Sequence, residues 1–245
     1  MAELLFFAFA FVAEVIGTMV GFGTSTIFLP LALFFIDFKA ALILVAIFHL
    51  FGTFGRLTFF RQGIDKRLAI AFGIPSVLFT IIGALLVNFV PQELLKFVLG
   101  IFLFFFSINS IFWREPKLAQ KNANAVLGGS ASGFIVGLIG TGGAIRSAFL
   151  NAFNLPKEKY IATAAIVALA VDFTRIPVYI ASGFLEEKFY YFIPLLLIIA
   201  IAGSFTGKKL VDIIPLGKFR KLVLAAIAVA GIKFIFDGII FFIAF

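Results

Sequence analysis

The sequence has no cysteine and a single histidine, and these gaps restrict the chemistry that the chain can perform. Without cysteine there is no disulfide bond, no thiolate metal ligand and no thiol redox reaction. One histidine, His49, argues against a metal site built from several imidazole ligands. The chain also lacks a carboxylate cluster, a nucleophile spaced from a base, and a phosphate-binding loop. We therefore expect no metal, no cofactor and no enzymatic activity.

Charged residues are scarce as well. Only 13% of the 245 residues are charged, 63% are hydrophobic, and the mean hydropathy is +1.19. Soluble domains are about half apolar and about a quarter charged, so this composition is that of an integral membrane protein. The net charge of +8 comes from Lys and Arg dispersed over short loops, where they set membrane orientation rather than bind nucleic acid. We expect a multi-pass protein of the cell membrane that begins with a membrane segment and not with a signal peptide.

Apolar segments long enough to cross a bilayer follow one another along most of the chain. A helix needs roughly 20 apolar residues to span the hydrocarbon core. Six segments fit this length: 40–60, 67–89, 93–113, 159–181, 188–210 and 219–243. Two more, 4–35 and 125–153, are longer and are interrupted by glycines at 17–23 and 133–143. As straight helices these two would reach ~45 Å, which exceeds the bilayer core.

The two halves of the chain resemble each other in sequence. The stretch GTMVGFGTSTIFLPLALF at 17–34 aligns with GFIVGLIGTGGAIRSAFLN at 133–151, and FGRLTFFRQG at 54–63 aligns with FTRIPVYIASG at 173–183. Internal duplication is typical of transporters built from two units. We therefore divide the chain into a first transmembrane repeat at 1–113, a cytoplasmic linker at 114–124 and a second transmembrane repeat at 125–245.

Basic residues in the loops indicate how the repeats are oriented. Loops 61–67, 114–121 and 208–221 are rich in Lys and Arg, whereas loops 89–92 and 182–188 are poor in them. If segments 4–35 and 125–153 each crossed once, loop 208–221 would lie outside, against the positive-inside bias. If each forms a hairpin that enters and leaves on one face, every strongly basic loop lies inside and both termini lie outside. We favour this arrangement over eight simple spans, and predict an all-α polytopic fold with two inverted repeats, each a broken, re-entrant helical hairpin plus three transmembrane helices.

The glycine-rich interruptions predict an anion site. Half-helices should begin near Thr24 and Gly142, and the first N–H groups of a helix lack intrahelical partners and carry partial positive charge. In an inverted pair, two such ends would face each other near the middle of the membrane, an arrangement that selects anions. The predicted binding residues are Gly23, Thr24, Ser25, Thr26, Gly140, Thr141, Gly142 and Gly143. The alternative is close helix packing, which we favour for Gly17, Gly21, Gly133 and Gly137.

Three arginines stand within apolar segments and are predicted to attract the anion. Arg146 follows the second interruption, and its planar guanidinium suits an oxyanion. Arg56 and Arg175 occupy aligned positions in the two halves, so we expect them to line the substrate path symmetrically. The structural alternatives are snorkelling or a carboxylate partner for Arg146, and mutual neutralisation between Arg175 and Asp172.

Proton coupling has two candidates within the apolar segments. They are His49 and Asp172, although a hydrogen-bonded packing role is an equal alternative for His49. Glu14 lies within the first interrupted segment, where it is either a coupling site or an acid near the outer interface. We leave Glu14 out of the predicted site.

The openings of the two repeats resemble a known family. The sequences GFGTSTIFLP and GLIGTGGAIRSAFLNAFNLP, with DFTR following the second, are similar to those of the TauE/SafE family of sulfite and sulfonate transporters, also called the toluene-sulfonate uptake permease family. The resemblance covers nearly the whole chain and implies transport of small sulfur-containing oxyanions such as sulfite, sulfoacetate or related organosulfonates. The family commonly has a run of three glycines here. In this chain the first opening reads Gly-Thr-Ser-Thr and the second ends in Ala-Ile-Arg, which leaves the exact substrate open.

Together these observations predict a secondary transporter of small anions, with sulfur oxyanions favoured. The anion would be held between two glycine-rich helix tips and moved by alternating access. A passive anion channel is the alternative within transport, and a membrane scaffold that transports nothing is the alternative outside it. The expected partners are a small anion and the lipid bilayer, with coupled protons or ions and a homo-oligomer as further options, and without nucleic acid.

Overall fold

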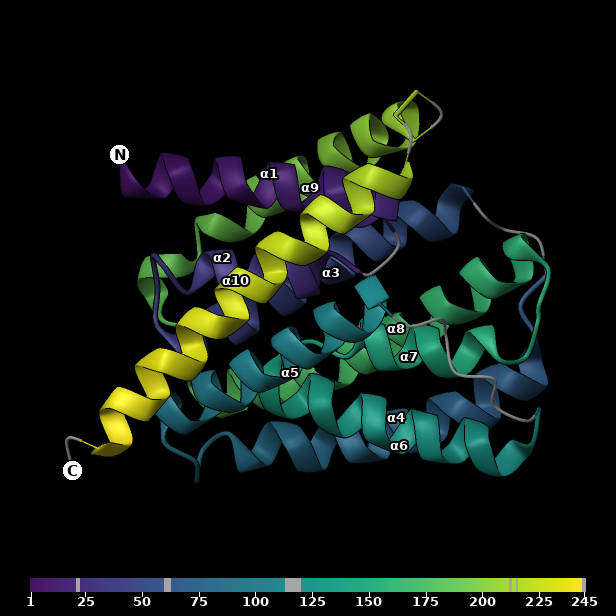
Figure 1. Ribbon diagram of the computed structural model, residues 1–245, viewed down its shortest axis with the longest axis horizontal. Helices are drawn as coiled ribbons and strands as arrows, with labels where there is room; N and C mark the ends of the chain where they lie inside the picture. The colour runs from purple at the N-terminus through teal and green to yellow at the C-terminus, as the bar shows by residue number, and fades with distance from the viewer. Residues whose placement is uncertain (21–22, 60–62, 113–119, 212, 215, 244–245) are drawn as a thin grey trace.

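Helices account for all of the regular structure in the computed structural model, which describes residues 1–20, 23–59, 63–112, 120–211, 213–214 and 216–243 (Figure 1). No strand occurs within these ranges, so the all-α prediction is confirmed. The predicted linker, 114–124, lies largely outside them, and its last three residues already belong to a helix. In chain order the helices are α1 (Ala2–Val20), α2 (Thr24–Ala32), α3 (Phe38–Phe59), α4 (Lys66–Leu86), α5 (Gln92–Phe112), α6 (Asn122–Ile139), α7 (Gly143–Asn151), α8 (Lys157–Ala181), the 3-10 helix η1 (Glu187–Phe189), α9 (Phe192–Leu210) and α10 (Leu216–Ile243).

Eight helices within the described ranges are long and apolar enough to cross a membrane. Six of them, α3, α4, α5, α8, α9 and α10, match the six predicted spans to within a few residues. The other two, α1 and α6, have 19 and 18 residues and form the first parts of the two longer, glycine-interrupted segments. The protein is therefore a multi-pass membrane protein, as its composition predicted.

Both glycine-rich interruptions break the helix where the sequence predicted. The short helix α2 begins at Thr24 and the short helix α7 begins at Gly143, against predicted starts near Thr24 and Gly142. The chain turns at Gly23 and Gly140, whose φ angles of 84° and 74° lie in the left-handed region that favours glycine. Each short helix has 9 residues, about half the length of the helix before it.

Each short helix folds back along the helix that precedes it. A Cβ added to Gly17 in α1 would lie 2.9 Å from the Cα of Thr24 at the start of α2, which confirms the predicted packing role of Gly17. In the second half, a Cβ added to Gly128 in α6 would lie 2.4 Å from the ring of Phe149 near the end of α7. Each interrupted segment is therefore a helical hairpin with one long and one short arm.

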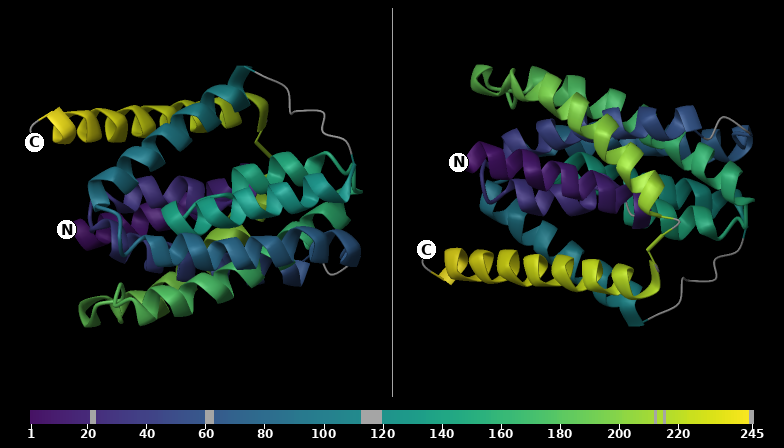
Figure 2. Two further views of the ribbon diagram at one scale, coloured as in Figure 1. Left: turned by 90° about the horizontal axis from the view of Figure 1, so that it is seen from below. Right: turned by 90° about the horizontal axis from the view of Figure 1, so that it is seen from above.

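The helices of one half pack on the helices of the other. α1 packs on α9 and α4 packs on α6, while α3 packs on α9 and α4 packs on α8. α3 also packs on α8, and α5 packs on α10, a pair that lies at one edge of the molecule in Figure 2. Exchanging the corresponding helices of the two halves, α1 with α6, α3 with α8, α4 with α9 and α5 with α10, reproduces the same set of pairs.

Glycine residues allow α4 and α6 to approach closely. Cβ atoms added to Gly133 and Gly137 in α6 would lie 2.1 Å and 2.3 Å from the carbonyl oxygens of Ser76 and Thr80 in α4. The Thr80 hydroxyl donates a hydrogen bond of 3.0 Å to the carbonyl oxygen of Gly133. Small residues and interhelical hydroxyl bonds are typical of packing in membranes, so the predicted packing role of both glycines is confirmed. Gly21, the remaining glycine of this prediction, lies outside the described residues.

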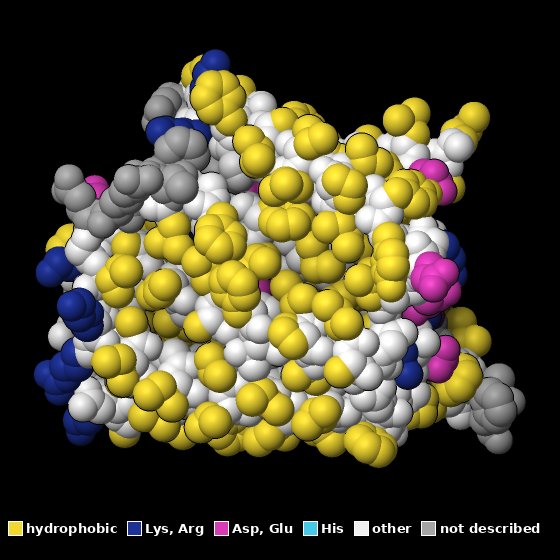
Figure 3. All heavy atoms as spheres, turned by 180° about the vertical axis from the view of Figure 1, so that it is seen from behind, with side chains coloured by type: hydrophobic (Ala, Val, Ile, Leu, Met, Phe, Trp, Pro, Cys, Tyr) yellow, Lys and Arg dark blue, Asp and Glu magenta, His cyan; other side chains and the backbone are white. Residues whose placement is uncertain are grey.

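Charged side chains mark the two ends of the molecule. On the face shown in Figure 3, apolar side chains cover the middle, Lys and Arg gather at one end, and Asp and Glu gather at the other. The basic end lies opposite the two chain termini, which share one end of the molecule in Figure 1. An apolar belt between two charged ends is the surface that a bilayer requires.

Candidate functional site

The two helix breaks meet in the interior of the protein. The hydroxyls of Thr26 in α2 and Thr141 in the second break share a hydrogen bond, with 2.8 Å between the Oγ1 atoms. Both side chains are fully buried. The sequence predicted that the starts of the two half-helices would face each other, and the structure brings these two residues into direct contact.

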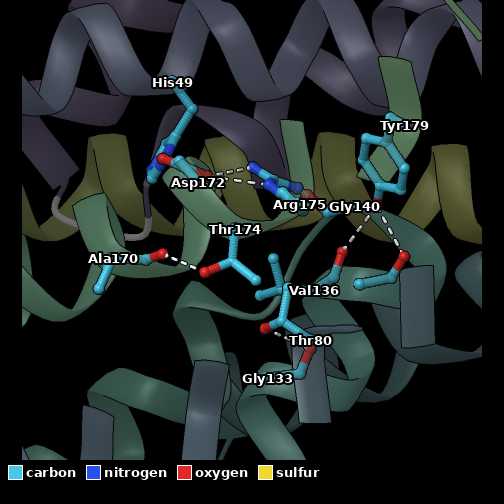
Figure 4. A network of polar contacts seen from close by, with 11 residues as sticks. His49, Thr80, Gly133, Val136, Gly140, Ala170, Asp172, Thr174, Arg175 and Tyr179 are labelled. Atoms are coloured by element: carbon cyan, nitrogen blue, oxygen red, sulfur yellow. Dashed lines mark hydrogen bonds and ion pairs between the residues drawn. The ribbon is translucent and has the colours of Figure 1, made fainter. Parts of the chain in front are cut away.

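Two side chains of α8 bind carbonyl groups at the second break (Figure 4). Arg175 Nη1 donates a hydrogen bond of 3.0 Å to the carbonyl oxygen of Gly140. The Tyr179 hydroxyl donates a bond of 2.6 Å to the carbonyl oxygen of Gly137, in the last turn of α6. Carbonyl groups at the end of a helix have no intrahelical donor, so these bonds satisfy them and fix the loop that leads into α7.

The start of α7 presents backbone donors. Its N-cap residue, Gly142, makes no side-chain capping bond, and its carbonyl oxygen accepts from the N–H of Arg146 at 3.0 Å. The Ser132 hydroxyl donates to the same carbonyl oxygen, also at 3.0 Å. The N–H groups of the first turn have no carbonyl acceptor within the helix, and the helix dipole gives them partial positive charge. This end of α7 is therefore suited to a negatively charged group.

A buried chain of ionisable side chains links α3 to α8 beside the second break (Figure 4). His49 Nδ1 lies 2.6 Å from Oδ2 of Asp172, and Arg175 Nε donates to Oδ1 of Asp172 at 2.9 Å. These three residues are 4%, 1% and 1% exposed, so none of them reaches an open path. Asp172 pairs with Arg175 in the way that the structural alternative described, and Arg175 also binds the second break.

The other ring nitrogen of His49 faces the first break. A Cβ added to Gly23, the N-cap residue of α2, would lie 3.5 Å from Nε2 of His49. The hydrogen-bonded chain therefore runs from His49, which lies beside the N-cap residue of α2, through Asp172 and Arg175 to the carbonyl oxygen of Gly140. The two residues predicted to couple protons thus bond to each other between the two breaks.

A carboxylate outside the predicted site lies at the first break. Glu14 is fully buried, and its oxygens accept hydrogen bonds from the hydroxyls of Thr24 at 2.5 Å, Ser204 at 2.6 Å and Thr18 at 3.3 Å. Thr24, a predicted substrate ligand, therefore directs its hydroxyl to Glu14. The sequence signal that points to this acid is its position inside an apolar run that leads into a helix break.

The remaining predicted residues lie close to the breaks or on the helices beside them. Ser25 and Gly143 are buried in the first turns of α2 and α7. Arg146 is 9% exposed and shares a face of α7 with the fully buried Leu150, four residues further on. Arg56 lies in α3, but its side chain is outside the described part of the structure.

A cavity of about 700 Å³ opens between α5 and the hairpin of α6 and α7. It reaches Val20, the last residue of α1, and Ala144 in the first turn of α7. Its polar lining includes Asn109, Asn151 and Arg220, which lie near helix ends on the side of the basic loops. The cavity therefore leads from the basic end of the molecule to residues that flank both breaks.

Fold and site together define a class of protein. Helices that break and meet inside a multi-pass membrane protein are typical of secondary transporters, which bind their substrates at such breaks. In the parts of the chain that the structure describes, no group of three or more His, Cys, Asp or Glu side chains could hold a metal ion. The arrangement is that of a membrane transporter.

The chain belongs to the TauE/SafE sulfite exporter family, because the sequence model of that family matches residues 6–234, nearly its whole length. This match confirms the resemblance carried by the two repeat openings. No solved structure shows a significant match to the chain.

Two relatives with assigned names have the same general description. "Probable membrane transporter protein YdhB" of Bacillus subtilis is 25% identical over 195 residues, which cover 74% of this chain and 78% of the relative. "Probable membrane transporter protein MJ0441" of Methanocaldococcus jannaschii is 25% identical over 221 residues, which cover 81% of each chain. The family and both names indicate a membrane transporter and not an enzyme.

Proposed function

We propose that the chain is a secondary transporter of small anions, with sulfur oxyanions as its substrate class, and that the anion binds between the tips of α2 and α7. The observation that carries this proposal is the 2.8 Å contact between Thr26 and Thr141 in the buried interior. Two half-helix N-termini directed at one point offer backbone N–H donors and partial positive charge to a single anion. The substrate class rests on the family, which is described as a sulfite exporter family.

The oxyanion takes the place of the contact between the two threonines. The hydroxyls of Thr26 and Thr141 bond to each other in the present state, and each can rotate to donate to an anion that separates them. The N–H groups in the first turn of α7 supply further donors. Arg146, one turn into α7, supplies a full positive charge and a planar set of donors that matches the oxygens of a sulfite or sulfonate group.

The cavity beside α7 supports access from one side at a time. It extends from the basic end to residues beside both breaks, and beyond it Thr26 and Thr141 are fully buried. A route that is open at one end and closed at the tips favours a carrier, because a conducting channel needs a continuous path. Rocking one hairpin against the other would open the tips toward the opposite end.

The packing of the helices supports inverted repeats as the basis of this movement. Each half has one hairpin and three long helices, and the most extensive helix pairs are reproduced when the halves are exchanged. Under the positive-inside bias, loops 61–67 and 208–221 would lie in the cytoplasm together with the mouth of the cavity, and both termini would lie outside. Repeats 1–113 and 125–245 would then each contribute one half-helix tip to a shared site.

Uptake by proteoliposomes tests this function. The purified chain should take up radiolabelled sulfite, thiosulfate or an organosulfonate in a saturable manner. Unlabelled anion inside the vesicles should accelerate the uptake, which is expected of a carrier and not of a channel. Uptake no faster than that of protein-free liposomes for every anion in the panel would overturn the proposal and leave a scaffold role.

A further inference from the structure

The first break contains a buried acid that the anion site does not use. Glu14 lies in the second half of α1 and accepts hydrogen bonds from Thr18 on α1, Thr24 at the start of α2 and Ser204 on α9. A carboxylate within a membrane-spanning helix is costly, and such residues are generally retained for ion or proton movement. Glu14 is therefore a functional candidate on grounds of depth and contacts together.

The neighbouring helices leave space for this carboxylate. A Cβ added to Gly52 in α3 would lie 2.5 Å from Oε1 of Glu14, and a Cβ added to Gly203 in α9 would lie 2.8 Å from its Cβ. Any side chain at either glycine would displace Glu14 or the helix. The carboxylate thus occupies a fitted position where α1, α2, α3 and α9 come together.

Few other titratable side chains stand on these helices. α2 has none, and those of α3 and α9 are His49 and Arg56, apart from lysines in the first turn of α3 and the last turn of α9. His49 is bonded to Asp172, and the side chain of Arg56 is outside the described part of the structure. Glu14 is the one carboxylate that these helices bring to the first break within the described residues.

We propose that Glu14 binds the proton that drives anion transport; this proposal rests on the proposed function and identifies its coupling cation. The hydroxyl of Thr24 at the tip of α2 donates a hydrogen bond to Glu14. We call the tip docked while this bond is made, and movement of the tip away from α1 breaks it. While the tip is docked, the hydroxyl of Thr24 is one of three hydroxyl groups that donate to the carboxylate. When the tip moves away to admit an anion, Glu14 loses that donor, and a buried charge with fewer hydrogen bonds is costly.

The proton therefore binds when the tip opens. A carboxylate oxygen of Glu14 forms an O–H bond with a proton taken from water on the open side. When the tip docks again after the protein has opened to the other side, the proton returns to water there and the hydroxyl of Thr24 donates to the carboxylate once more. The anion and the proton cross together, and a pH gradient supplies the driving force.

Glu14→Gln tests the proposal in proteoliposomes, because the amide keeps the shape of the side chain and cannot ionise. An inward proton gradient should accelerate uptake of a sulfur oxyanion by the unmodified protein. In Glu14→Gln this acceleration should be lost, while exchange of labelled for unlabelled anion without a gradient should persist. Glu3→Gln is the matched control, since Glu3 lies exposed on the same helix, and it should behave as the unmodified protein does.

Ser204→Ala provides a second test that leaves the carboxylate in place. It removes one hydroxyl donor from Glu14 and leaves the ionisable group itself unchanged. The pH of half-maximal uptake should differ from that of the unmodified protein, and an unchanged pH profile would contradict the proposal. If Glu14→Gln does not fold, the pH profile of Ser204→Ala tests the role of Glu14 instead.

Three further results would overturn the assignment of Glu14. One is proton-driven uptake that persists in Glu14→Gln, and another is uptake that follows a sodium gradient and ignores the pH gradient. The third is folded Glu14→Gln protein that has lost exchange together with proton-driven uptake, which would make Glu14 a structural residue. In each case the unmodified protein still transports anions, whereas failure of the proposed function would appear as no transport by the unmodified protein.

Discussion

The two helix breaks have related sequences, but the charged side chains that bond to them differ. At the first break, the carboxylate of Glu14 accepts a hydrogen bond from Thr24 at the start of α2. At the second break, the guanidinium of Arg175 binds the carbonyl oxygen of Gly140, and Arg146 stands within α7. The backbone plan is similar at both breaks, with a glycine in the left-handed region and a 9-residue helix after it.

The alignment of the two halves shows where this difference arises. Arg146 aligns with Leu29 in the first half, and Glu14 aligns with Ser130 in the second. The two helix ends thus have similar geometry, but one has a carboxylate beside it and the other a guanidinium. Because an ionised acid repels an anion and a guanidinium attracts it, the second helix end contributes more of the attraction for the shared anion than the first does. Similar backbone geometry therefore does not imply a similar role.

The largest expected effect concerns the orientation of the two halves. Single cysteines at Ile64 and Glu186, both exposed and in aligned connections of the two repeats, should react with a membrane-impermeant thiol reagent from opposite sides. The sequence has no other cysteine, so the labelling is unambiguous. We expect residue 64 to be cytoplasmic and residue 186 external. Labelling of both from the same side would contradict the inverted arrangement.

The second expected effect is on the stability of the second break. Arg175→Ala removes one of the two partners of the buried Asp172, the other being His49, and removes the donor to the carbonyl oxygen of Gly140. Breaking a buried pair in this way costs about 3–5 kcal/mol, so the melting temperature in detergent should fall sharply. Ser204→Ala, which removes one hydroxyl donor to the carboxylate of Glu14, should cost less, about 1.5–3 kcal/mol. Equal losses for the two variants would show that the breaks are held in the same way.

Most of the fold could be predicted from the sequence, because the patterns that indicate its helices and breaks are local. Runs of about 20 apolar residues indicate spans, and glycines inside a longer run indicate a break. The close approach of α4 and α6 was readable only in part. Gly133 and Gly137 stand at small-residue spacing, but their partners, the carbonyl groups of Ser76 and Thr80, become evident only once the register of the two helices is known.

Sequence analysis could predict the contacts of the site that follow from the two facing half-helices. It could not predict the contacts that depend on the depth of a residue in the membrane. The approach of Thr26 to Thr141 follows from facing half-helices. Glu14 was ambiguous, because its depth in the membrane and its bond with Ser204, 190 residues away, are set by how α1 packs on α9. The ion pair between Asp172 and Arg175 lies at helical spacing, whereas the further bond from Arg175 to Gly140 spans two helices and has no local signal.

The third expected effect is on anion affinity at the second break. Arg146→Ala removes charge and donors, and we expect it to weaken binding of a sulfur oxyanion by about a hundredfold. Arg146→Lys keeps the charge but loses the planar donor set, so a smaller loss is expected. Arg67→Ala, at an exposed arginine in the first turn of α4, is the control. Equilibrium binding to detergent-purified protein measures all three, and unchanged affinity in Arg146→Ala would assign Arg146 to packing.

The smallest expected effect concerns the contact between the two breaks, and threonine variants measure it more cleanly than glycine variants do. A Cβ at Gly142 would lie 2.4 Å from the side chain of Val136 and 2.7 Å from the carbonyl oxygen of Ser132, so Gly142→Val would disturb the hairpin whether or not an anion binds there. Thr→Val removes only the hydroxyl and keeps the shape of the side chain. The threonines are therefore the better probes of binding.

Thr26→Val and Thr141→Val should each weaken anion binding by about tenfold, because each removes one donor to a charged ligand. Each single variant also breaks the bond between the two hydroxyls in the empty state and keeps one of them, whereas the double variant replaces both groups at once. The summed stability losses of the two single variants should therefore exceed the stability loss of the double variant. Their affinity losses, in contrast, should be close to additive. Thermal unfolding and equilibrium binding of the three variants measure the two quantities. If anion affinity is unchanged in Thr26→Val and reduced in Thr141→Val, the anion is held by the second break alone. The role of the first break would then be limited to its hydrogen bond with Glu14.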